Sequence, residues 1–177
     1  GDTTCIDAAV ATATAERLIT ADGVKAIVGG DCSGVTTAAL QNVAKPNGVV
    51  MISPSATSPA LSTIEDDGLF FRTAPSDARQ GVIVAQILKE NGFKNVAITY
   101  TNNDYGKGLA DSIATNVKAM GGKVTINAPH EDGKGDYTAE VGALAAAGGE
   151  LLVVAGYVDQ GGRGIVQASI DTGAFDR

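Results

Sequence analysis

Apolar and polar positions follow a repeating pattern along the chain. Six short apolar runs alternate with amphipathic stretches of about four turns, and Gly, Asn, Ser or Asp separates them. This alternation is typical of an α/β fold with parallel sheets. Most of the apolar runs lack strict alternation, so we expect helices to cover both faces of each sheet. The predicted strands are 24–28, 49–52, 69–72, 95–100, 123–127 and 151–155.

The amphipathic stretches carry helix start and stop signals. Asp2, Thr3 or Thr4 is expected to cap the first helix, which ends at Asp22-Gly23. Paired residues such as Asn91-Gly92 stand where a helix must end, because glycine accepts a positive φ. The other predicted helices are 35–44, 77–90, 108–120, 138–146 and 160–170.

One junction suggests a division into two lobes. Pro75 disfavours helix at Ala74, and Ser76 or Asp77 can cap the helix that follows. We therefore expect one lobe over 1–74 and a second over 75–177. A single six-stranded sheet is the alternative. The polar loop 53–63 follows a strand end, which is where ligands bind in open α/β sheets.

Both ends of the chain interrupt the pattern. The sequence begins on a helix cap and stops after a helix, where further strands are expected. We therefore expect a fold that is incomplete at both ends. Unpaired strand edges attract other strands, so homodimer formation through the truncated edges is also expected.

Charge and apolar content exclude several classes. Hydrophobic residues make up 44% of the 177 residues, too many for a disordered chain. The 20 acidic and 13 basic residues give a net charge of -7, which disfavours nucleic acid and anionic membranes as partners. No apolar run reaches the roughly 18 residues of a membrane-spanning helix.

Catalytic and cofactor motifs are missing from the sequence. Neither a dinucleotide nor a P-loop pattern is present, and Gly30-Asp-Cys-Ser-Gly34 has the wrong register for a nucleophile elbow. Ser33 with the single histidine, His130, would be a lone pairing, and we expect His130 in a surface loop beside Glu131 and Asp132. Loop 131–136 resembles a calcium loop only loosely, because Lys134 stands at a ligand position. We expect no catalytic residue, no metal and no cofactor.

Small hydroxyl residues do gather after the first two predicted strands. Both groups precede expected helix starts, where backbone N–H groups favour a carboxylate, although each residue alone could simply cap a helix. Tyr105 and Tyr157 follow the fourth and sixth strands and could close over a ligand or pack as half-buried rings. The hydroxyl residues are Ser33, Thr36, Ser53, Ser55, Thr57 and Ser58.

The two cysteines, Cys5 and Cys32, lie before the first helix and after the first strand. A bridge across 27 residues would stabilise the fold by about 3 to 4 kcal/mol in an oxidising compartment. Two buried free thiols are the alternative.

These residues together resemble a known family, the periplasmic solute-binding proteins for branched-chain amino acids of ABC transporters. The matching segments occur in family order and span nearly the whole chain. They are 2–5 (DTTC), 28–33 (VGGDCS), 51–59 (MISPSATSP), 71–73 (FRT) with 77–81, 104–109 (DYGKGL), 135–137 (GDY) and 155–157 (AGY).

The resemblance implies a type I periplasmic-binding-protein fold, with two Rossmann-like lobes that close on a ligand. It also implies a disulfide between Cys5 and Cys32. Ser33 and Thr57 would hydrogen-bond a ligand carboxylate, helped by the main chain of Ser55 and Thr57. Tyr105 and Tyr157 would contribute from the second lobe, and the acidic residue that answers the ligand ammonium would lie beyond this chain.

The function implied is that of a periplasmic substrate-binding subunit, without enzymatic activity, that takes a branched-chain amino acid or a related small carboxylate or amide. Its partner would be the membrane permease of the transporter. One alternative is a ligand-sensing domain of a regulator with the same fold. A small α/β hydrolase is the other.

Overall fold

The computed structural model describes residues 2–175, and the chain divides into two compact units, Gly1–Ser76 and Asp77–Arg177. Each unit holds its own three-stranded parallel sheet, so the alternative of one six-stranded sheet is wrong. The expected lobe boundary after Ala74 lies just before the division seen in the structure.

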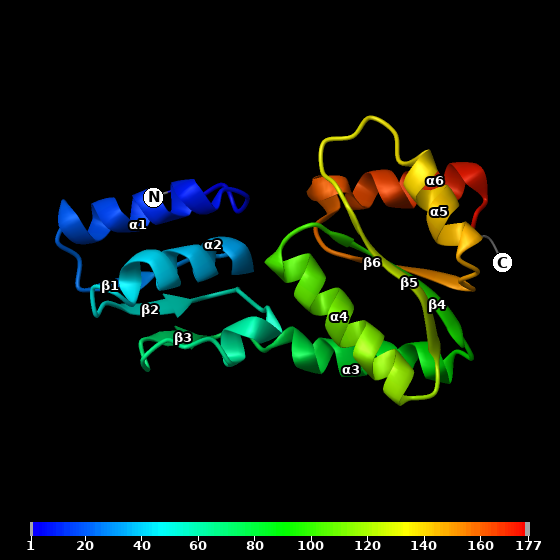
Figure 1. Cartoon of the computed structure of the whole chain (residues 1–177), viewed down its shortest axis with the longest axis horizontal. Helices are drawn as coiled ribbons and strands as arrows, with labels where there is room; N and C mark the ends of the chain where they lie inside the picture. The colour runs from blue at the N-terminus through cyan, green and yellow to red at the C-terminus, as the bar shows by residue number, and fades with distance from the viewer. Residues whose placement is uncertain (1, 176–177) are drawn as a thin grey trace. The chain divides into compact units, whose positions relative to one another are not determined.

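Unit 1 is a sheet of order β1-β2-β3 with its helices on one side (Figure 1). Helix α1 is capped by Asp7, whose carboxylate accepts hydrogen bonds from two backbone N–H groups, so the expected caps at 2–4 were wrong. The elements are α1 (Ala8–Thr20), β1 (Ala26–Val28), α2 (Ser33–Ala39), a π-helical turn (Leu40–Ala44), β2 (Val50–Ser53), a 3-10 turn (Pro59–Ser62) and β3 (Phe70–Arg72).

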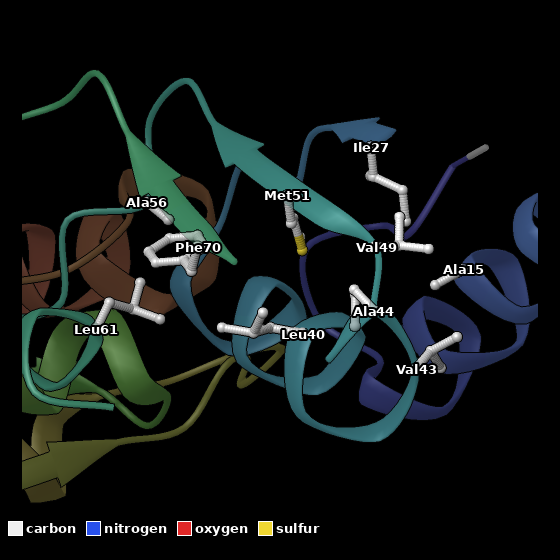
Figure 2. Packing of buried hydrophobic residues seen from close by; sticks show 11 residues of the cluster. Ala15, Ile27, Leu40, Val43, Ala44, Val49, Met51, Ala56, Leu61 and Phe70 are labelled. Atoms are coloured by element: carbon white, nitrogen blue, oxygen red, sulfur yellow. The ribbon is translucent and has the colours of Figure 1, made fainter. Parts of the chain in front are cut away.

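The core of unit 1 fills the space between the sheet and its helices. Ile27, Met51 and Phe70 are cross-strand neighbours and point toward Leu40 and Val43 (Figure 2). Strand side chains alternate between faces, so the next residue of each strand points the opposite way.

That opposite face of the unit 1 sheet is open to solvent. Val28, Ile52 and Phe71 pair across the three strands and are 79%, 37% and 54% exposed. The expectation that helices cover both faces is therefore wrong for unit 1, as far as residues 2–175 are concerned. We call Val28, Ile52 and Phe71 the apolar row.

Unit 2 has the strand order β5-β4-β6. Helix α4 begins four residues before its predicted start, and β5 runs three residues further than predicted. Gln160 and Gly161 have non-helical backbone angles, which delays the last helix to Arg163. The elements are α3 (Asp77–Glu90), β4 (Asn95–Thr101), α4 (Asp104–Ala119), β5 (Lys123–His130), α5 (Thr138–Ala146), β6 (Leu151–Ala155), a π-helical turn (Val158–Gly162) and α6 (Arg163–Thr172).

Helices cover both faces of the unit 2 sheet (Figure 1). Helices α3 and α4 pack on one face against Val96 and Ile98 of the central strand. Helices α5 and α6 pack on the other face, where Leu152 and Val154 of β6 contact their core. This two-sided burial explains why β4 lacks a strict alternation of apolar and polar residues.

Candidate ligand-binding site

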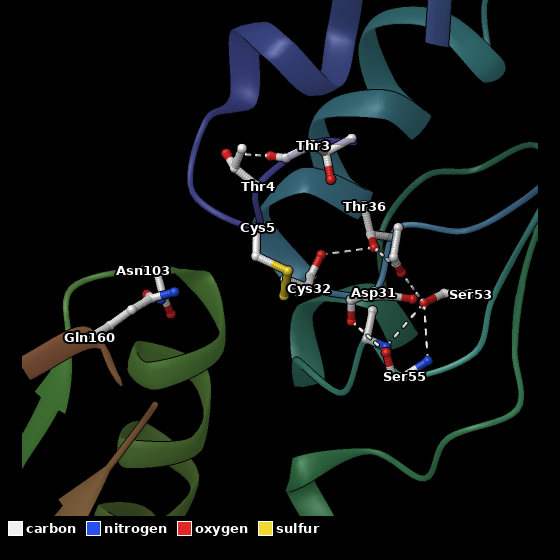
Figure 3. The surroundings of a disulfide bond; sticks show 12 residues. Thr3, Thr4, Cys5, Asp31, Cys32, Thr36, Ser53, Ser55, Asn103 and Gln160 are labelled. Atoms are coloured by element: carbon white, nitrogen blue, oxygen red, sulfur yellow. Dashed lines mark hydrogen bonds between the residues drawn. A yellow bond between two sulfur atoms is a disulfide. The ribbon is translucent and has the colours of Figure 1, made fainter. Parts of the chain in front are cut away.

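The hydroxyl residues of unit 1 meet where its strands end. The Ser53 hydroxyl donates to the carbonyl oxygen of Gly30 at 2.6 Å, and Thr36 Oγ1 donates to the same carbonyl at 2.9 Å (Figure 3). Ser53 Oγ in turn accepts the backbone N–H of Ala56 at 3.0 Å. These bonds join the loop after β1 to the loop after β2. We call Ser33, Ser53, Ser55, Thr57 and Ser58 the hydroxyl cluster.

Ser33 is the first residue of α2 and is only 1% exposed. Its Oγ accepts the backbone N–H of Ser58 at 3.1 Å, so its own proton remains able to be donated. Ser33, which we expected to bind the ligand, therefore also supports the loop after β2.

Ser55 and Thr57 are the more accessible members of the cluster, since Ser55 is exposed and Thr57 half-buried. The Ser55 hydroxyl donates to the carbonyl oxygen of Asp31 at 2.7 Å, which fixes its side chain (Figure 3). The loop that carries Ser55 and Thr57 leads into a short 3-10 turn, Pro59–Ser62, and not into an α-helix. The expectation of a helix dipole after β2 is therefore wrong. The groups that this loop offers to an anion are hydroxyl and backbone groups.

Cys5 and Cys32 form a disulfide with Cα atoms 5.3 Å apart, which excludes the alternative of two free thiols. Cys32 directly precedes Ser33, so the bridge ties the start of α2 to the segment before α1 (Figure 3). Thr4 and Cys5 have φ values of 55° and 60°, a left-handed conformation that costs energy for residues other than glycine. The bridge therefore holds a strained turn beside the hydroxyl cluster.

In unit 2, Tyr105 and Tyr157 form a ring pair with centroids 4.8 Å apart and planes tilted by 37°. The pKa of Tyr157 is raised to about 12, mainly by burial and secondly by the nearby Tyr105. Burial, followed by the charge of Asp77, also raises the pKa of Tyr105. Both phenols therefore stay protonated at neutral pH and present half-buried aromatic surface. We call these two residues the tyrosine pair.

Helix α4 brings Tyr105 to this place through its N-cap. The side chain of Asn103 accepts the backbone N–H of Gly106 at 2.8 Å, and its amide donates to Gln160 Oε1 at 3.2 Å. A Cβ on Gly106 would lie 2.2 Å from the carbonyl oxygen of Thr101, so the helix approaches the end of β4 very closely. Sequence reasoning missed Asn103, although asparagine followed by aspartate is a common helix start.

His130 is buried, which corrects the expectation of a surface loop. It ends β5, is 1% exposed and lies between the hydroxyls of Thr99 and Thr101. Strand β5 continues to this residue because it pairs with β4 up to Thr101. Ser33 and His130 belong to different units, and each already has hydrogen-bond partners of its own.

Each unit therefore brings together the site residues predicted for it. The hydroxyl cluster holds Ser33, Ser55 and Thr57, and the tyrosine pair holds Tyr105 and Tyr157. Among residues 2–175 there is no group of three or more His, Cys, Asp or Glu residues placed to bind a metal ion. Within the same part of the chain, no helix combines the length and apolar character needed to cross a membrane.

Comparison with known proteins finds relatives over most of the chain. A protein from Brucella melitensis, the Leu/Ile/Val-binding protein homolog 3, is 36% identical over 153 residues, which cover 84% of this chain and 40% of the relative. The leucine-, isoleucine-, valine-, threonine-, and alanine-binding protein of Pseudomonas aeruginosa is 33% identical over 165 residues, 91% of this chain and 43% of the relative. The chain thus spans less than half the length of these curated relatives.

Solved structures share the fold. A solute-binding protein of an ABC transporter from Rhodopseudomonas palustris, in complex with 4-hydroxybenzoate, has a TM-score of 0.85 at 21% identity over 98% of this chain and 46% of the other. An ABC transporter substrate-binding protein from Desulfitobacterium hafniense, in complex with leucine, has a TM-score of 0.73 at 25% identity over 95% of this chain and 50% of the other. The family described as periplasmic binding protein matches residues 5–175. The chain belongs to the periplasmic binding protein family.

Proposed function

We propose that this chain is part of a substrate-binding subunit of an ABC transporter and that it takes a branched-chain amino acid or a related small carboxylate or amide. The names of the Brucella and Pseudomonas relatives support the amino acid class. The type I fold, with its two units, supports binding by closure of the units over the ligand.

The observation that carries the proposal is the hydroxyl cluster at the strand ends of unit 1. Ser33 retains a proton to donate, and Thr57 lies half-buried on the loop that Ser33 holds. In the proposed complex both hydroxyls donate to the ligand carboxylate, and the main chain of Ser55 and Thr57 contributes further donors. A charge-assisted hydrogen bond of this kind is worth about 1.5 to 3 kcal/mol.

The tyrosine pair supplies the second part of the proposed site. Two half-buried rings offer apolar surface to an aliphatic side chain, and the phenol groups can hydrogen-bond polar atoms of the ligand. The role is one of binding and release without chemical change. Its partners are the small ligand and the membrane permease, in the periplasm.

A calorimetric titration of the chain with leucine, isoleucine, valine, threonine, alanine and 4-hydroxybenzoate tests the proposal. We expect heat from the aliphatic amino acids, and a loss of roughly 10-fold to 100-fold in affinity in Ser33→Ala and Thr57→Val. Thr115→Ala, on the exposed surface of α4, is the matched control and should leave affinity unchanged.

Two outcomes would contradict this assignment. Binding of 4-hydroxybenzoate alone would move the ligand class to aromatic acids. Equal affinity in the wild type and both cluster variants would remove Ser33 and Thr57 from the site.

A further inference from the structure

His130, the single histidine of the chain, is a buried titratable group to which the proposed binding function gives no role. Its Nδ1 lies 3.0 Å from Thr99 Oγ1, and its Nε2 lies 3.3 Å from Thr101 Oγ1. Both threonines belong to β4, the central strand of unit 2. The imidazole is therefore held at two points against the end of this strand.

Thr101 connects the imidazole to the segment that carries Tyr157. Its Oγ1 accepts the backbone N–H of Tyr157 at 3.0 Å and donates to the carbonyl oxygen of Gln160 at 3.3 Å. A hydroxyl has one proton and two lone pairs. One tautomer of His130 satisfies all three contacts at once: with the Thr101 proton on Gln160 and one lone pair on Tyr157, the other lone pair accepts the Nε2–H of His130. Nδ1 then accepts the hydroxyl proton of Thr99.

The turn over residues 156–161 also fits closely against these two side chains. A Cβ on Gly156 would lie 2.0 Å from Thr101 Oγ1, and a Cβ on Gly161 would lie 2.7 Å from Cδ2 of His130. Both glycines have positive φ values, 149° and 86°, which other residues rarely adopt. The backbone on both sides of Tyr157 therefore lies directly on Thr101 and His130.

The charge state of His130 agrees with this hydrogen-bond pattern. Burial has the largest influence on the pKa of His130 and lowers it, while the nearby backbone of Gln160 and the carboxylates of Glu131, Glu140 and Asp132 act in the opposite direction. The lowered pKa favours the neutral imidazole at pH 7, which carries a proton on one nitrogen only.

We propose that His130 is a positioning residue for Tyr157: its Nε2–H fixes the orientation of the Thr101 hydroxyl, which holds the 156–161 turn and with it the geometry of the tyrosine pair. The consequence for ligand affinity rests on the proposed function, whereas the effect on the tyrosine pair does not.

The protonation pattern can be tested in the wild-type chain without substitution. Nitrogen-15 NMR of the imidazole, at a pH where it is neutral, should show the Nε2–H tautomer. The Nδ1–H tautomer would overturn the proposal, because Thr101 would then lack the donor that completes its bonds.

Fluorine NMR of chain labelled with 3-fluorotyrosine tests the positioning itself. The chain has four tyrosines, so Tyr157 and Tyr105 can be assigned from Tyr157→Phe and Tyr105→Phe. His130→Gln keeps an amide donor near the place of Nε2, whereas His130→Asn keeps polar atoms only near Nδ1. We expect the Tyr157 signal to move in His130→Asn and to stay in His130→Gln. Thr99→Val, which removes only the Nδ1 partner, is the matched control and should leave the signal in place.

Leucine titrations then connect the geometry to binding. We expect affinity to fall roughly 3-fold to 10-fold in His130→Asn, and this loss to disappear in the Tyr157→Ala background. A chain that binds no leucine would contradict the proposed function and leave the fluorine result to decide the positioning role. An unmoved Tyr157 signal in His130→Asn, or an equal movement in His130→Gln, would overturn that role.

Discussion

The side-chain oxygen of Ser33 accepts the backbone N–H of Ser58 at 3.1 Å, across 25 residues of sequence, and both residues are almost completely buried. One hydroxyl at the start of α2 therefore holds the loop that follows β2. This relationship gives Ser33 a role in stability that is separate from any role in binding.

Replacing Ser33 with alanine should lower the free energy of unfolding by about 1 to 3 kcal/mol, because the buried N–H of Ser58 loses its acceptor. Urea denaturation followed by circular dichroism measures this loss. The control is Ser55→Ala, whose side chain is exposed and should cost about 0.5 kcal/mol or less. Equal losses in the two variants would contradict the supporting role of Ser33.

Removing the disulfide by changing both Cys5 and Cys32 to serine should cost about 3 to 4 kcal/mol, because the unfolded chain regains the freedom of a loop of 27 residues. The comparison of urea midpoints and slopes in the oxidised wild type and the double variant gives the value. Treatment of the wild type with a reducing agent should reproduce the loss. A double variant as stable as the wild type would show that the strained turn at Thr4 and Cys5 offsets the bridge.

Gly156→Ala should destabilise unit 2 by on the order of 2 kcal/mol or more, because its φ of 149° and the Thr101 hydroxyl leave no room for a Cβ. Gly142→Ala in α5 is the opposite case, since nothing lies within 4 Å of its Cβ position. Alanine there should stabilise the helix by about 0.5 to 1 kcal/mol. Thermal unfolding of the two variants should therefore move in opposite directions, and a shared direction would refute the argument from close packing.

Alkaline pH should weaken the fold through Tyr157. Its pKa is raised to about 12, whereas a tyrosine in the unfolded chain titrates near pH 10. The unfolded state therefore loses its proton first, so stability is fully present below pH 10 and falls as pH rises toward 12. Absorbance titration at about 295 nm should show one late-ionising phenol that is absent in Tyr157→Phe. Identical titration curves for the two proteins would exclude this assignment.

The apolar row of unit 1 should drive association of the isolated chain, since large exposed apolar patches mark interaction surfaces. This refines the homodimer expected from strand edges to a face of the sheet. Ile52→Thr should shift sedimentation toward the monomer at high protein concentration. Ile83→Thr on α3 is a matched control, because both isoleucines are 37% exposed. A chain that is monomeric at every concentration would rule out association through this row.

The sequence predicted the bounds of helices and strands best where a proline or a pair of glycines marks one end of the element. The helix Asp77–Glu90 and the strand Leu151–Ala155 have the predicted bounds, since Pro75 sets the helix start and two glycines precede the strand. The predicted start of α4, Gly108, lies four residues too late. In the structure, Asn103 caps the helix and Gly106 packs against β4. Local patterns do not encode such close approach.

The candidate site likewise has features that the sequence could predict and features that it could not. That Tyr105 and Tyr157 lie close together could be predicted, because both follow strand ends of one sheet. The buried place of His130 could not, since it depends on pairing between β5 and β4 and on two hydroxyls 29 and 31 residues away. The support of the Ser58 backbone by Ser33 likewise depends on tertiary contact alone.

The one-sided covering of the unit 1 sheet has a consequence for folding. Unit 1 still exposes Val28, Ile52 and Phe71 after its own helices have packed, whereas unit 2 buries both faces of its own sheet. Exposed apolar β-surface makes partly assembled chains prone to aggregation. Unit 1 would therefore present a binding surface to a chaperone that recognises apolar β-structure even when unit 1 itself is folded.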